Sequence, residues 1–481
     1  MNDIASRVLH FAREFSGIPN SPFLYGPVLT KIMALLDEWG IPEISRTNSR
    51  SQGVFWMDEF ALYVHFRRGR ACRPLLIDSH LDHPGFVFNS QGNGFGFGSL
   101  GFKRIAGLLK KHGHIDLRIY NPKGEFTGLA PLTGMNGFNA RLEPGRRIEN
   151  NSHGMWDVPD FELQNDKLLM YSADNMIVTD VMLALIEQIA LSPAQFPDLD
   201  VTFVFTFLEE VFEASAAGIA MRGRMPIGRL DSNWSVIVLE SMEPVALTGK
   251  ERKFDGSSLK GLRLEEDADA VDFRQPGGRV SSIYKTLDLP LPGPDLGVAI
   301  KVNDMDCVYG YQFPGQPNLS EELLLAAARR VSPVFQHTVF GGACNGTAFS
   351  LYGLTGNIAT LSVPNPLKHN IGKNGEIVPE EVRLSDVAAA GNIMLDVLMR
   401  SGEPVFGGDD AGLARRLKET DLTPDPKTAR RLKAERSAIA WGAKARLKGR
   451  RYFHDNFVEF MLDKSRAALS RAREAVEGRL G

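Results

Sequence analysis

Two nearly continuous apolar runs most strongly constrain the fold of this chain. Val201–Leu208 and Ser235–Leu239 are rich in Val, Ile and Phe and contain few polar residues. Strands that are buried on both faces of a parallel sheet have this composition. The stretch between them, Ala214–Arg222, has the residue spacing of a helix. Strand, helix and strand in this order predict an α/β fold with a mixed, mostly parallel sheet flanked by helices.

The rest of the chain supplies further elements of such a fold. Helical spacing occurs in Ile4–Phe15, Tyr25–Trp39, Asp174–Ala190, Leu323–Arg330 and Val382–Arg400, and strand patterns occur in Gly53–Arg67, Pro74–Ile77 and Gly356–Val363. Residues 91–165 differ, because they are dense in glycine and lack helical periodicity. We therefore expect a main domain of residues 1–90 and 166–405 with a surface excursion at 248–290. A β-rich insertion domain (91–165) and a helical, basic C-terminal extension (406–481) complete the predicted organisation.

The composition excludes several classes of protein. Among the 481 residues are three cysteines, Cys72, Cys307 and Cys344, which lie far apart and form no CxxC pair. This argues against a disulfide scaffold and against a cysteine-bound zinc finger. No apolar run approaches the roughly 20 residues that cross a bilayer, and the N-terminus lacks the apolar segment of a signal peptide. We therefore expect a cytoplasmic protein without a membrane partner.

The C-terminal extension is basic, although the whole chain has a net charge of −3. Its Lys and Arg residues are interleaved with Ala, Leu and Glu at helical spacing, and no aromatic residues suited to base stacking accompany them. A solvated helical face accounts for this pattern better than a nucleic-acid site does. We therefore expect no nucleic-acid partner.

Residues that can bind metal ions stand at the ends of several predicted strands and at the start of one helix. They are His80, Asp174, Glu209, Glu210, Glu240 and His369. In open α/β sheets, ligands gather beyond the carboxyl ends of the strands. We therefore expect two imidazoles and several carboxylates to converge on one crevice.

The adjacent pair Glu209 and Glu210 is the most informative of these positions. No Lys or Arg occurs between Val201 and Met221 to neutralise the pair, and a buried carboxylate needs a cation or hydrogen-bond donors. A metal ion is the simplest cation that would hold this much negative charge together. Asp82, two residues after His80, could orient that imidazole. Taken singly, other residues have ordinary explanations, since Asp174 could cap its helix and His80 could be a buried structural histidine.

Six segments occur in an order that resembles one peptidase family. They are HLDHPGFV, SADN, FTFLEEVFEASAAG, VLES, GGACNGTA and PNPLKHNIGKNGEIV. Their order is similar to that of the M42 glutamyl aminopeptidase family, which belongs to the wider M28/M20 group of co-catalytic zinc peptidases. The family patterns are H-x-D-x-x-G, an Asp-Asp or Asp-Asn helix start, Glu-Glu, an acid after an apolar strand, and a late His. The sequence departs from the common pattern at His83, Asn175 and Cys344-Asn345.

The resemblance implies a site for two divalent metal ions, with zinc expected and cobalt or manganese as alternatives. It makes His80 and His369 terminal ligands, Asp174 the bridging carboxylate, and Glu210 and Glu240 ligands of one ion each. Glu209 would be the general base that takes a proton from the water bridging the metal ions and passes it to the leaving amine, and Asp82 would orient His80. The insertion would form a small β-barrel, which in relatives helps to build dimers and larger assemblies.

Three functions therefore compete. The leading interpretation is a metal-dependent aminopeptidase that removes N-terminal residues from short peptides and works as a homo-oligomer. The second is a deacylase or amidase that acts on N-acylated small molecules, because the same metal chemistry cleaves both bonds. The third is a non-catalytic binding protein that uses the basic extension. The presence of Glu209 argues against the third.

Overall fold

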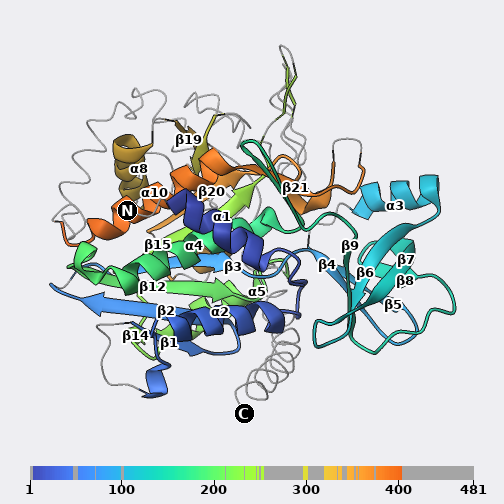
Figure 1. Cartoon of the computed structure of the whole chain (residues 1–481), viewed down its shortest axis with the longest axis horizontal. Helices are drawn as coiled ribbons and strands as arrows, with labels where there is room; N and C mark the ends of the chain where they lie inside the picture. Colours follow the sequence, from blue (N-terminus) through green and yellow to red (C-terminus); the bar gives the residue numbers. More distant parts are fainter. Residues whose placement is uncertain are drawn as a thin grey trace, which may run out of the picture.

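An eight-stranded sheet forms the centre of the molecule (Figure 1). The structure is a computed structural model that describes residues 4–46, 53–70, 72–98, 102–211, 213–231, 233–244, 246–248, 251–253, 296–301, 319–332, 334–338, 344–351, 354–355, 357–372 and 375–403. The strands, in their order across the sheet, are β1 (Val54–Met57), β2 (Ala61–Arg68), β12 (Leu199–Thr206), β3 (Leu75–His80), β15 (Ser235–Met242), β20 (Ile358–Pro364), β18 (Val298–Lys301) and β19 (Phe335–Thr338).

The middle of this sheet is parallel. β12 pairs with β3, β3 with β15, and β15 with β20, all in the same direction. Every residue of β3, β15 and β20 is buried, as the apolar runs predicted. These observations confirm the α/β fold with a mixed, mostly parallel sheet. Because the strands run parallel, their carboxyl ends meet along one edge of the sheet.

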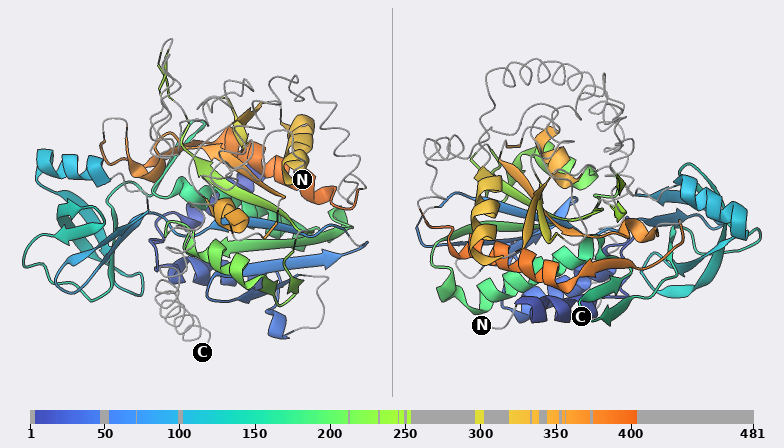
Figure 2. Two further views of the ribbon diagram at one scale, coloured as in Figure 1. Left: turned by 180° about the vertical axis from the view of Figure 1, so that it is seen from behind. Right: turned by 90° about the horizontal axis from the view of Figure 1, so that it is seen from above.

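Helices cover both faces of the sheet (Figure 2). On one face α4 (Ala173–Leu191) packs on β3 and β15, and α10 (Leu384–Met399) packs on β20. The N-terminal helix α1 (Ile4–Phe15) lies against both α4 and α10, and α8 (Leu319–Val331) lies beside α10. On the other face α5 (Ala214–Arg222) contacts α9 (Asn345–Leu351), which packs on β15 and β20. The remaining elements of this part are α2 (Gly26–Glu38), the 3-10 turns η1 (Ile44–Arg46), η2 (Pro193–Gln195) and η3 (Lys368–Asn370), and the hairpin β13 (Arg224–Met225) and β14 (Gly228–Arg229).

A closed six-stranded barrel lies at one end of the sheet (Figures 1 and 2). Its strands are β4 (Gly85–Phe88), β5 (Asn93–Phe97), β6 (Ile115–Tyr120), β7 (Phe126–Asn136), β8 (Asn139–Leu142) and β9 (Ser152–Trp156). The barrel has its own hydrophobic core, in which the ring of Phe86 meets Trp156 edge-on at 5.2 Å. This barrel is the architecture that the resemblance implied for the glycine-rich insertion.

Two features of the 91–165 region differ from the sequence reading. The region contains a helix, α3 (Phe102–His112), which buries Ile105 and Leu109 and ends in exposed basic residues. Its apolar residues Ile105, Leu108 and Leu109 do follow helical spacing, but the glycine-rich segments on both sides led to the prediction of a β-rich region. The strand β10 (Phe161–Gln164) lies outside the barrel and joins β11 (Lys167–Met170) and β21 (Glu380–Arg383) in a separate three-stranded sheet.

Parts of the predicted organisation lie outside the described residues. These are the C-terminal extension at 406–481 and most of the excursion at 248–290, of which the structure describes only the hairpin of β16 (Ala246–Thr248) and β17 (Glu251–Lys253). Across the part of the chain that is described, no helix combines the length and the apolar character that crossing a bilayer requires.

Candidate metal centre

The parallel register brings three of the predicted residues to one edge of the sheet. His80 is the last residue of β3 and lies opposite Thr206, the last residue of β12. Glu209 follows β12 after two further buried residues. Glu240 lies within β15 and not at its end, because that strand continues to Met242. The convergence expected from the strand ends therefore exists in the fold.

Asp174 comes to the same site from a helix and not from a strand. It lies in the first turn of α4, where its backbone is not helical and its peptide bond to Asn175 is cis. The residue before the helix is Ser172, so Asp174 does not act as the helix cap. Its carboxylate is fully buried and lies between His80 and His369. Asn175 holds this turn against the sheet, since its Nδ2 donates a hydrogen bond to the carbonyl oxygen of Leu239 at 2.8 Å.

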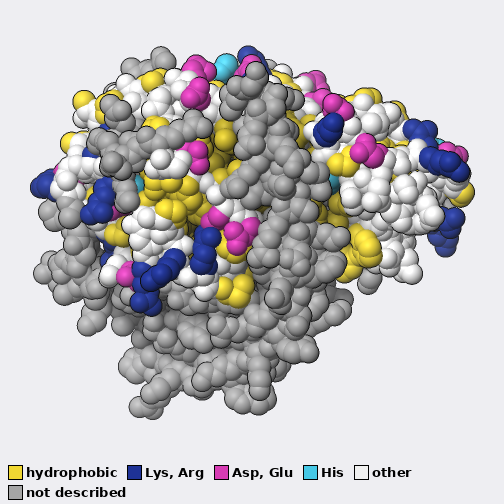
Figure 3. Space-filling model, turned by 90° about the horizontal axis from the view of Figure 1, so that it is seen from below, with side chains coloured by type: hydrophobic (Ala, Val, Ile, Leu, Met, Phe, Trp, Pro, Cys, Tyr) yellow, Lys and Arg dark blue, Asp and Glu magenta, His cyan; other side chains and the backbone are white. Residues whose placement is uncertain are grey.

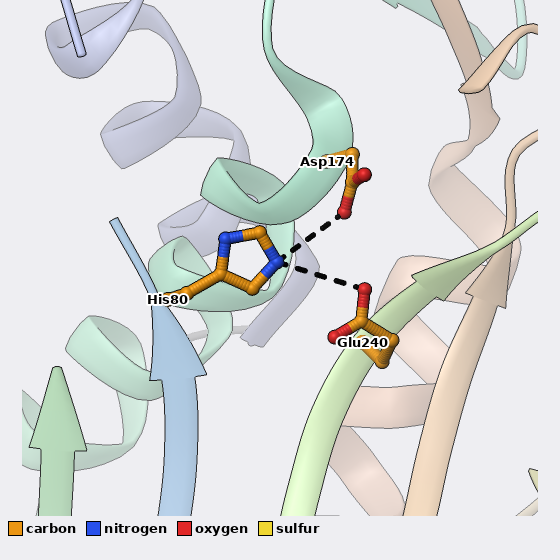
Figure 4. Close-up of side chains that lie close together, drawn as sticks. All are labelled: His80, Asp174 and Glu240. Atoms are coloured by element: carbon orange, nitrogen blue, oxygen red, sulfur yellow. Dashed lines mark ion pairs between the residues drawn. The ribbon is translucent and has the colours of Figure 1, made fainter. Parts of the chain in front are cut away.

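One group of possible ligands forms around His80 (Figure 4). Its Nε2 atom points between Asp174 Oδ1 at 3.6 Å and Glu240 Oε1 at 3.7 Å. Glu209 Oε2 is 3.9 Å from the same nitrogen. All four residues are buried. An imidazole and two carboxylates at such separations could hold a divalent ion.

A second and tighter group forms around His369. Its Nε2 atom lies 3.0 Å from Asp174 Oδ2 and 3.1 Å from Glu210 Oε1. The residue has a left-handed backbone (φ 63°), which turns its side chain back toward the sheet from η3. Asp174 thus contributes one carboxylate oxygen to each group.

Asp82 supports the site mainly through backbone groups. Its Oδ1 accepts a hydrogen bond from the backbone N–H of Glu209 at 3.0 Å, and its Oδ2 accepts one from that of Glu210 at 3.1 Å. His80 Nδ1 lies 2.8 Å from the carbonyl oxygen of Asp82 and 3.5 Å from its Oδ1. Asp82 therefore lies beside His80, but beyond the end of β3, and its closer contact with the imidazole is made by its backbone carbonyl. Its carboxylate holds the Glu209-Glu210 turn in position, and an orienting role toward His80 stays a prediction.

The barrel meets the site at Gly98. Its backbone N–H donates a hydrogen bond to the carbonyl oxygen of Glu210 at 2.9 Å. Gly98 has a φ of +80°, and a Cβ atom there would lie 2.7 Å from Glu210 Oε2. Only glycine lets the chain pass this close to the carboxylate in this conformation.

The carboxylates have different electrostatic environments. Burial raises the pKa of Glu209 well above its usual value, and the charges of Glu210 and Glu240 add to this effect against the opposing influence of His80. Burial also raises the pKa of Asp82, to about 6. Burial alone would raise the pKa of Asp174 as well, but the neighbouring Lys368 and the two imidazoles hold it well below its usual range. The surroundings therefore favour the anionic form of Asp174, whereas burial favours the protonated form of Glu209.

Two residues that the sequence reading did not single out complete the site. Lys368 lies with its Nζ atom 3.0 Å from Asp174 Oδ2 and 3.1 Å from Glu240 Oε1. Glu380 is fully buried and accepts hydrogen bonds from the backbone N–H groups of both Asp174 and His369. The only sequence signal for Lys368 is its place beside His369, and Glu380 has none, because it belongs to a strand of the small separate sheet.

Asn345, one of the departures from the family pattern, lies beneath the site. Its Nδ2 atom donates hydrogen bonds to Asp78 Oδ2 and to Thr206 Oγ1, each at 2.7 Å. Burial raises the pKa of Asp78 to about 7, although Asn345 opposes this effect. Asn345 therefore links α9 to β3 and β12 below the ligand groups.

The unsatisfied atoms of the site indicate that it suits a cation. Within the described residues, His80 Nε2, both carboxylate oxygens of Asp174 and Glu210 Oε1 have no well-directed hydrogen bond, and they meet only ion-pair partners at 3.0 to 3.9 Å. Buried polar atoms without hydrogen bonds are costly, and metal coordination satisfies them. The donor types, imidazole nitrogen and carboxylate oxygen, are those that zinc and similar ions take in proteins.

No family model matches this sequence, and no curated protein matches it. Solved structures with a similar fold exist. An aminopeptidase from the archaeon Desulfurococcus kamchatkensis has a TM-score of 0.56 and 14% sequence identity, over 86% of this chain and 98% of that chain. The TET1 peptidase of Pyrococcus horikoshii, described as assembling into a tetrahedron or a large octahedral shell, has a TM-score of 0.54 and 14% identity over 81% and 98%. Yeast aminopeptidase 1 has a TM-score of 0.52 and 11% identity over 87% and 100%. At these identities, the likeness is one of fold: this chain is built like TET-type and related aminopeptidases.

Proposed function

We propose that this protein is a metal-dependent aminopeptidase that hydrolyses the N-terminal residues of short peptides. The observation that carries the proposal is the tight group of Asp174, Glu210 and His369, buried beside Glu209 on a fold that solved aminopeptidases share. In this proposal the domain of residues 1–90 and 166–405 is catalytic, and the 91–165 insertion borders its site. A cytoplasmic location remains a prediction from the sequence.

The residues of the two groups would hold the metal. His80, Asp174 and Glu240 form one set and Asp174, Glu210 and His369 another, and a third set joins His80 to Glu209 and Glu210. The first two sets would offer ligands for up to two ions that share Asp174. A bound divalent ion would polarise the carbonyl of the scissile peptide bond and lower the pKa of a coordinated water. Zinc, cobalt and manganese all accept this donor set.

Glu209 is the residue proposed to move protons. It is next to Glu210 in the chain, and its carboxylate borders the ligand groups without belonging to the tighter one. Asp82 fixes the backbone of both glutamates, whose nearest imidazoles differ: Glu209 lies 3.9 Å from His80 Nε2, and Glu210 lies 3.1 Å from His369 Nε2. A carboxylate whose pKa is raised by burial is suited to take a proton from the attacking water and pass it to the leaving amine.

The proposal includes a homo-oligomer. Several large hydrophobic side chains of the barrel are exposed, among them Phe95 (55%), Phe126 (58%) and Phe138 (46%). Phe95 and Phe138 are neighbours, because the N–H of Gly96 bonds to the carbonyl oxygen of Phe138. Exposed apolar groups of this size are typical of association surfaces. On the face shown in Figure 3, hydrophobic side chains also reach the surface between interspersed acidic and basic residues.

The test is hydrolysis by metal-stripped and metal-restored protein. We expect cleavage of aminoacyl-anilides with a free amino group, loss of this activity in chelator, and its return on adding zinc, manganese or cobalt. N-acyl amino acids serve as the parallel substrate. Preference for them would replace the aminopeptidase with a deacylase, and activity that survives exhaustive chelation would contradict metal dependence. The matched control is Glu381→Gln, at a half-buried residue that pairs with Lys167.

A further inference from the structure

His83, one of the departures from the family pattern, lies between the two segments that carry the tighter ligand group. It is fully buried between β3 and β4. Its Nδ1 atom is in hydrogen-bond contact with the carbonyl oxygen of Asp174. Its Nε2 atom lies 2.8 Å from Oδ1 of Asn370, the residue after His369. One imidazole thus joins the segment of Asp174 to the segment of His369.

The amide of Asn370 is oriented from its other end. Its Nδ2 atom donates a hydrogen bond to the carbonyl oxygen of Tyr171 at 2.8 Å, so its oxygen is the atom that faces His83. This oxygen and the carbonyl oxygen of Asp174 can only accept, so an imidazole with hydrogen on both nitrogens satisfies both contacts. Burial lowers the pKa of His83, but the charge of Asp174 and the hydrogen bond to Asn370 oppose this effect. A neutral ring with its hydrogen on Nε2 keeps the bond to Asn370, so this bond does not require the charged form.

The bond to Asn370 acts on a strained turn. His369 and Asn370 both have a left-handed backbone, with φ of 63° and 62°. This conformation is uncommon for residues other than glycine, and it persists where the surrounding structure holds it. Here it turns the side chain of His369 back toward the sheet and the other ligands. The amide of Asn370, bonded at one end to His83 and at the other to Tyr171, is placed to hold this turn.

The contacts of His83 complement those of Glu380. Glu380 accepts hydrogen bonds from the backbone N–H groups of Asp174 and His369. His83 instead meets the carbonyl oxygen of Asp174 and the side chain that follows His369. The two segments are therefore cross-linked twice, through different groups. The ring of His83 is itself fixed by the ring of Tyr171, which packs edge-on at 4.9 Å.

We infer that His83 is a positioning residue for His369 in the proposed metal site. Through Asn370 it holds the left-handed turn that aims the imidazole of His369 at the ion. Its contact with Asp174 ties this turn to the other segment of the tighter ligand group. His83 does not bind the ion itself, because both of its nitrogens are engaged by oxygen atoms of the protein. This inference rests on the proposed metal dependence.

The zinc affinity of the full-length protein tests this role. Metal-stripped protein is titrated with zinc against a competing chelator. His83→Ala should weaken binding by about 10- to 100-fold, as the loss of a group that orients metal ligands commonly does. His83→Gln should restore most of the affinity, because the amide nitrogen of glutamine can take the place of Nε2 and donate to Asn370. The matched control is His65→Ala, which removes another buried imidazole, bonded to Thr202 within the sheet, and should leave the affinity unchanged.

A double-mutant cycle tests whether His83 acts through Asn370. Asn370→Ala removes the same contact from the other side and makes the left-handed backbone less favourable, so it should weaken zinc binding at least as much as His83→Ala. The double variant should bind zinc about as weakly as Asn370→Ala alone, because the effects of two residues in one contact do not add. Asn370→Gly also loses the side chain but adopts the left-handed backbone readily, so it should bind zinc more tightly than Asn370→Ala. The two Asn370 variants keep the test decisive if His83→Ala fails to fold.

Cobalt gives a readout that a general loss of stability would not change. The visible absorption of bound cobalt depends on the arrangement of its ligands. We expect an altered spectrum in His83→Ala at saturating cobalt, because His369 is no longer held in place. His65→Ala should keep the wild-type spectrum.

The outcomes separate the inference from the proposed function. Equal zinc affinity in the wild type and a folded His83→Ala would overturn the inference and leave a metal-dependent peptidase intact. The same holds if His65→Ala loses as much affinity, if His83→Gln binds as weakly as His83→Ala, or if the two losses multiply in the double variant. If the wild type binds no divalent ion, both the inference and the proposed function are wrong.

Discussion

Glu380 accepts a hydrogen bond from the backbone N–H of Asp174 at 2.7 Å, although the two residues are 206 positions apart in the chain. Its other carboxylate oxygen accepts the N–H of His369. One buried side chain thus fixes the backbones of the carboxylate and the imidazole that form the tighter ligand group. Groups that orient metal ligands in this way commonly contribute 10- to 100-fold to metal affinity.

Glu380→Gln should therefore weaken metal binding. The amide of Gln presents an N–H group to one of the two backbone N–H donors, which leaves that donor unsatisfied. We expect a loss of metal affinity of about 10- to 100-fold and a loss of stability of about 1–3 kcal/mol. Titration with a competing chelator and denaturant unfolding measure the two effects. Glu381→Gln, the next residue of β21, faces Lys167 and should change neither; equal effects in both variants would contradict the role of Glu380.

Glu209→Gln and Glu210→Gln should both lose activity, but for different reasons. Glu209→Gln removes the proposed base and keeps its size, so kcat should fall by about 10²- to 10⁴-fold with KM and metal content little changed. Glu210→Gln removes a proposed ligand, so metal content and activity should fall together and recover partly in excess metal. Steady-state kinetics together with metal analysis distinguish the two. The reverse pattern would mean that the two roles are exchanged.

Asp180 should make the stability of the protein depend on pH. It is fully buried in α4, neither of its carboxylate oxygens has a hydrogen-bond partner within the described residues, and burial raises its pKa well above the usual value. A carboxyl whose pKa is raised by folding is tolerated below its unfolded pKa, near 3.9, and destabilises the fold as the pH rises toward its folded pKa. Between these two pKa values, the free energy of unfolding falls by about 1.4 kcal/mol per pH unit for a single proton.

Asp180→Asn removes this ionisation. The free energy of unfolding of the variant relative to the wild type should therefore increase from pH 5 to pH 8, as measured by urea unfolding at each pH. Asp116→Asn, at a side chain of β6 that is 48% exposed, is the control for a general effect of losing one negative charge. If the difference in the free energy of unfolding between Asp180→Asn and the wild type stays constant from pH 5 to pH 8, the prediction is wrong.

The exposed rings of the barrel should take part in self-association. Replacing Phe95 and Phe138 together by Glu puts two charges into the proposed contact surface, and we expect a smaller assembly in light scattering with unchanged metal content. Leu191→Glu alters a residue that is 62% exposed at the end of α4, away from the barrel, and should leave the mass unchanged. If the mass of the assembly is the same in the barrel variant and in the wild type, these rings are not part of the interface between subunits.

The central fold could be predicted from local patterns. The apolar run Val201–Leu208 predicted a buried parallel strand, and Ala214–Arg222 predicted the helix that follows it with the same bounds as α5. Burial on both faces of a strand leaves a signal within a few residues, and so does the 3.6-residue repeat of a helix. The helix α3 was not predicted although its apolar residues follow the same repeat, because the glycine-rich segments around it favoured a β-rich interpretation of the whole region.

The sequence by itself also determined which side chains could meet. Parallel strands deliver their last residues to one edge of the sheet, so the positions of His80 and Glu209 after apolar runs were enough to predict that they converge. Only the tertiary structure decided which groups pair there: that His369 faces Glu210, that Lys368 reaches Asp174 and Glu240, and that Glu380 holds two ligand backbones. The physical reason is that periodicity records how each segment is buried. The partners of a buried charge depend instead on where distant segments pack, and no local pattern encodes that.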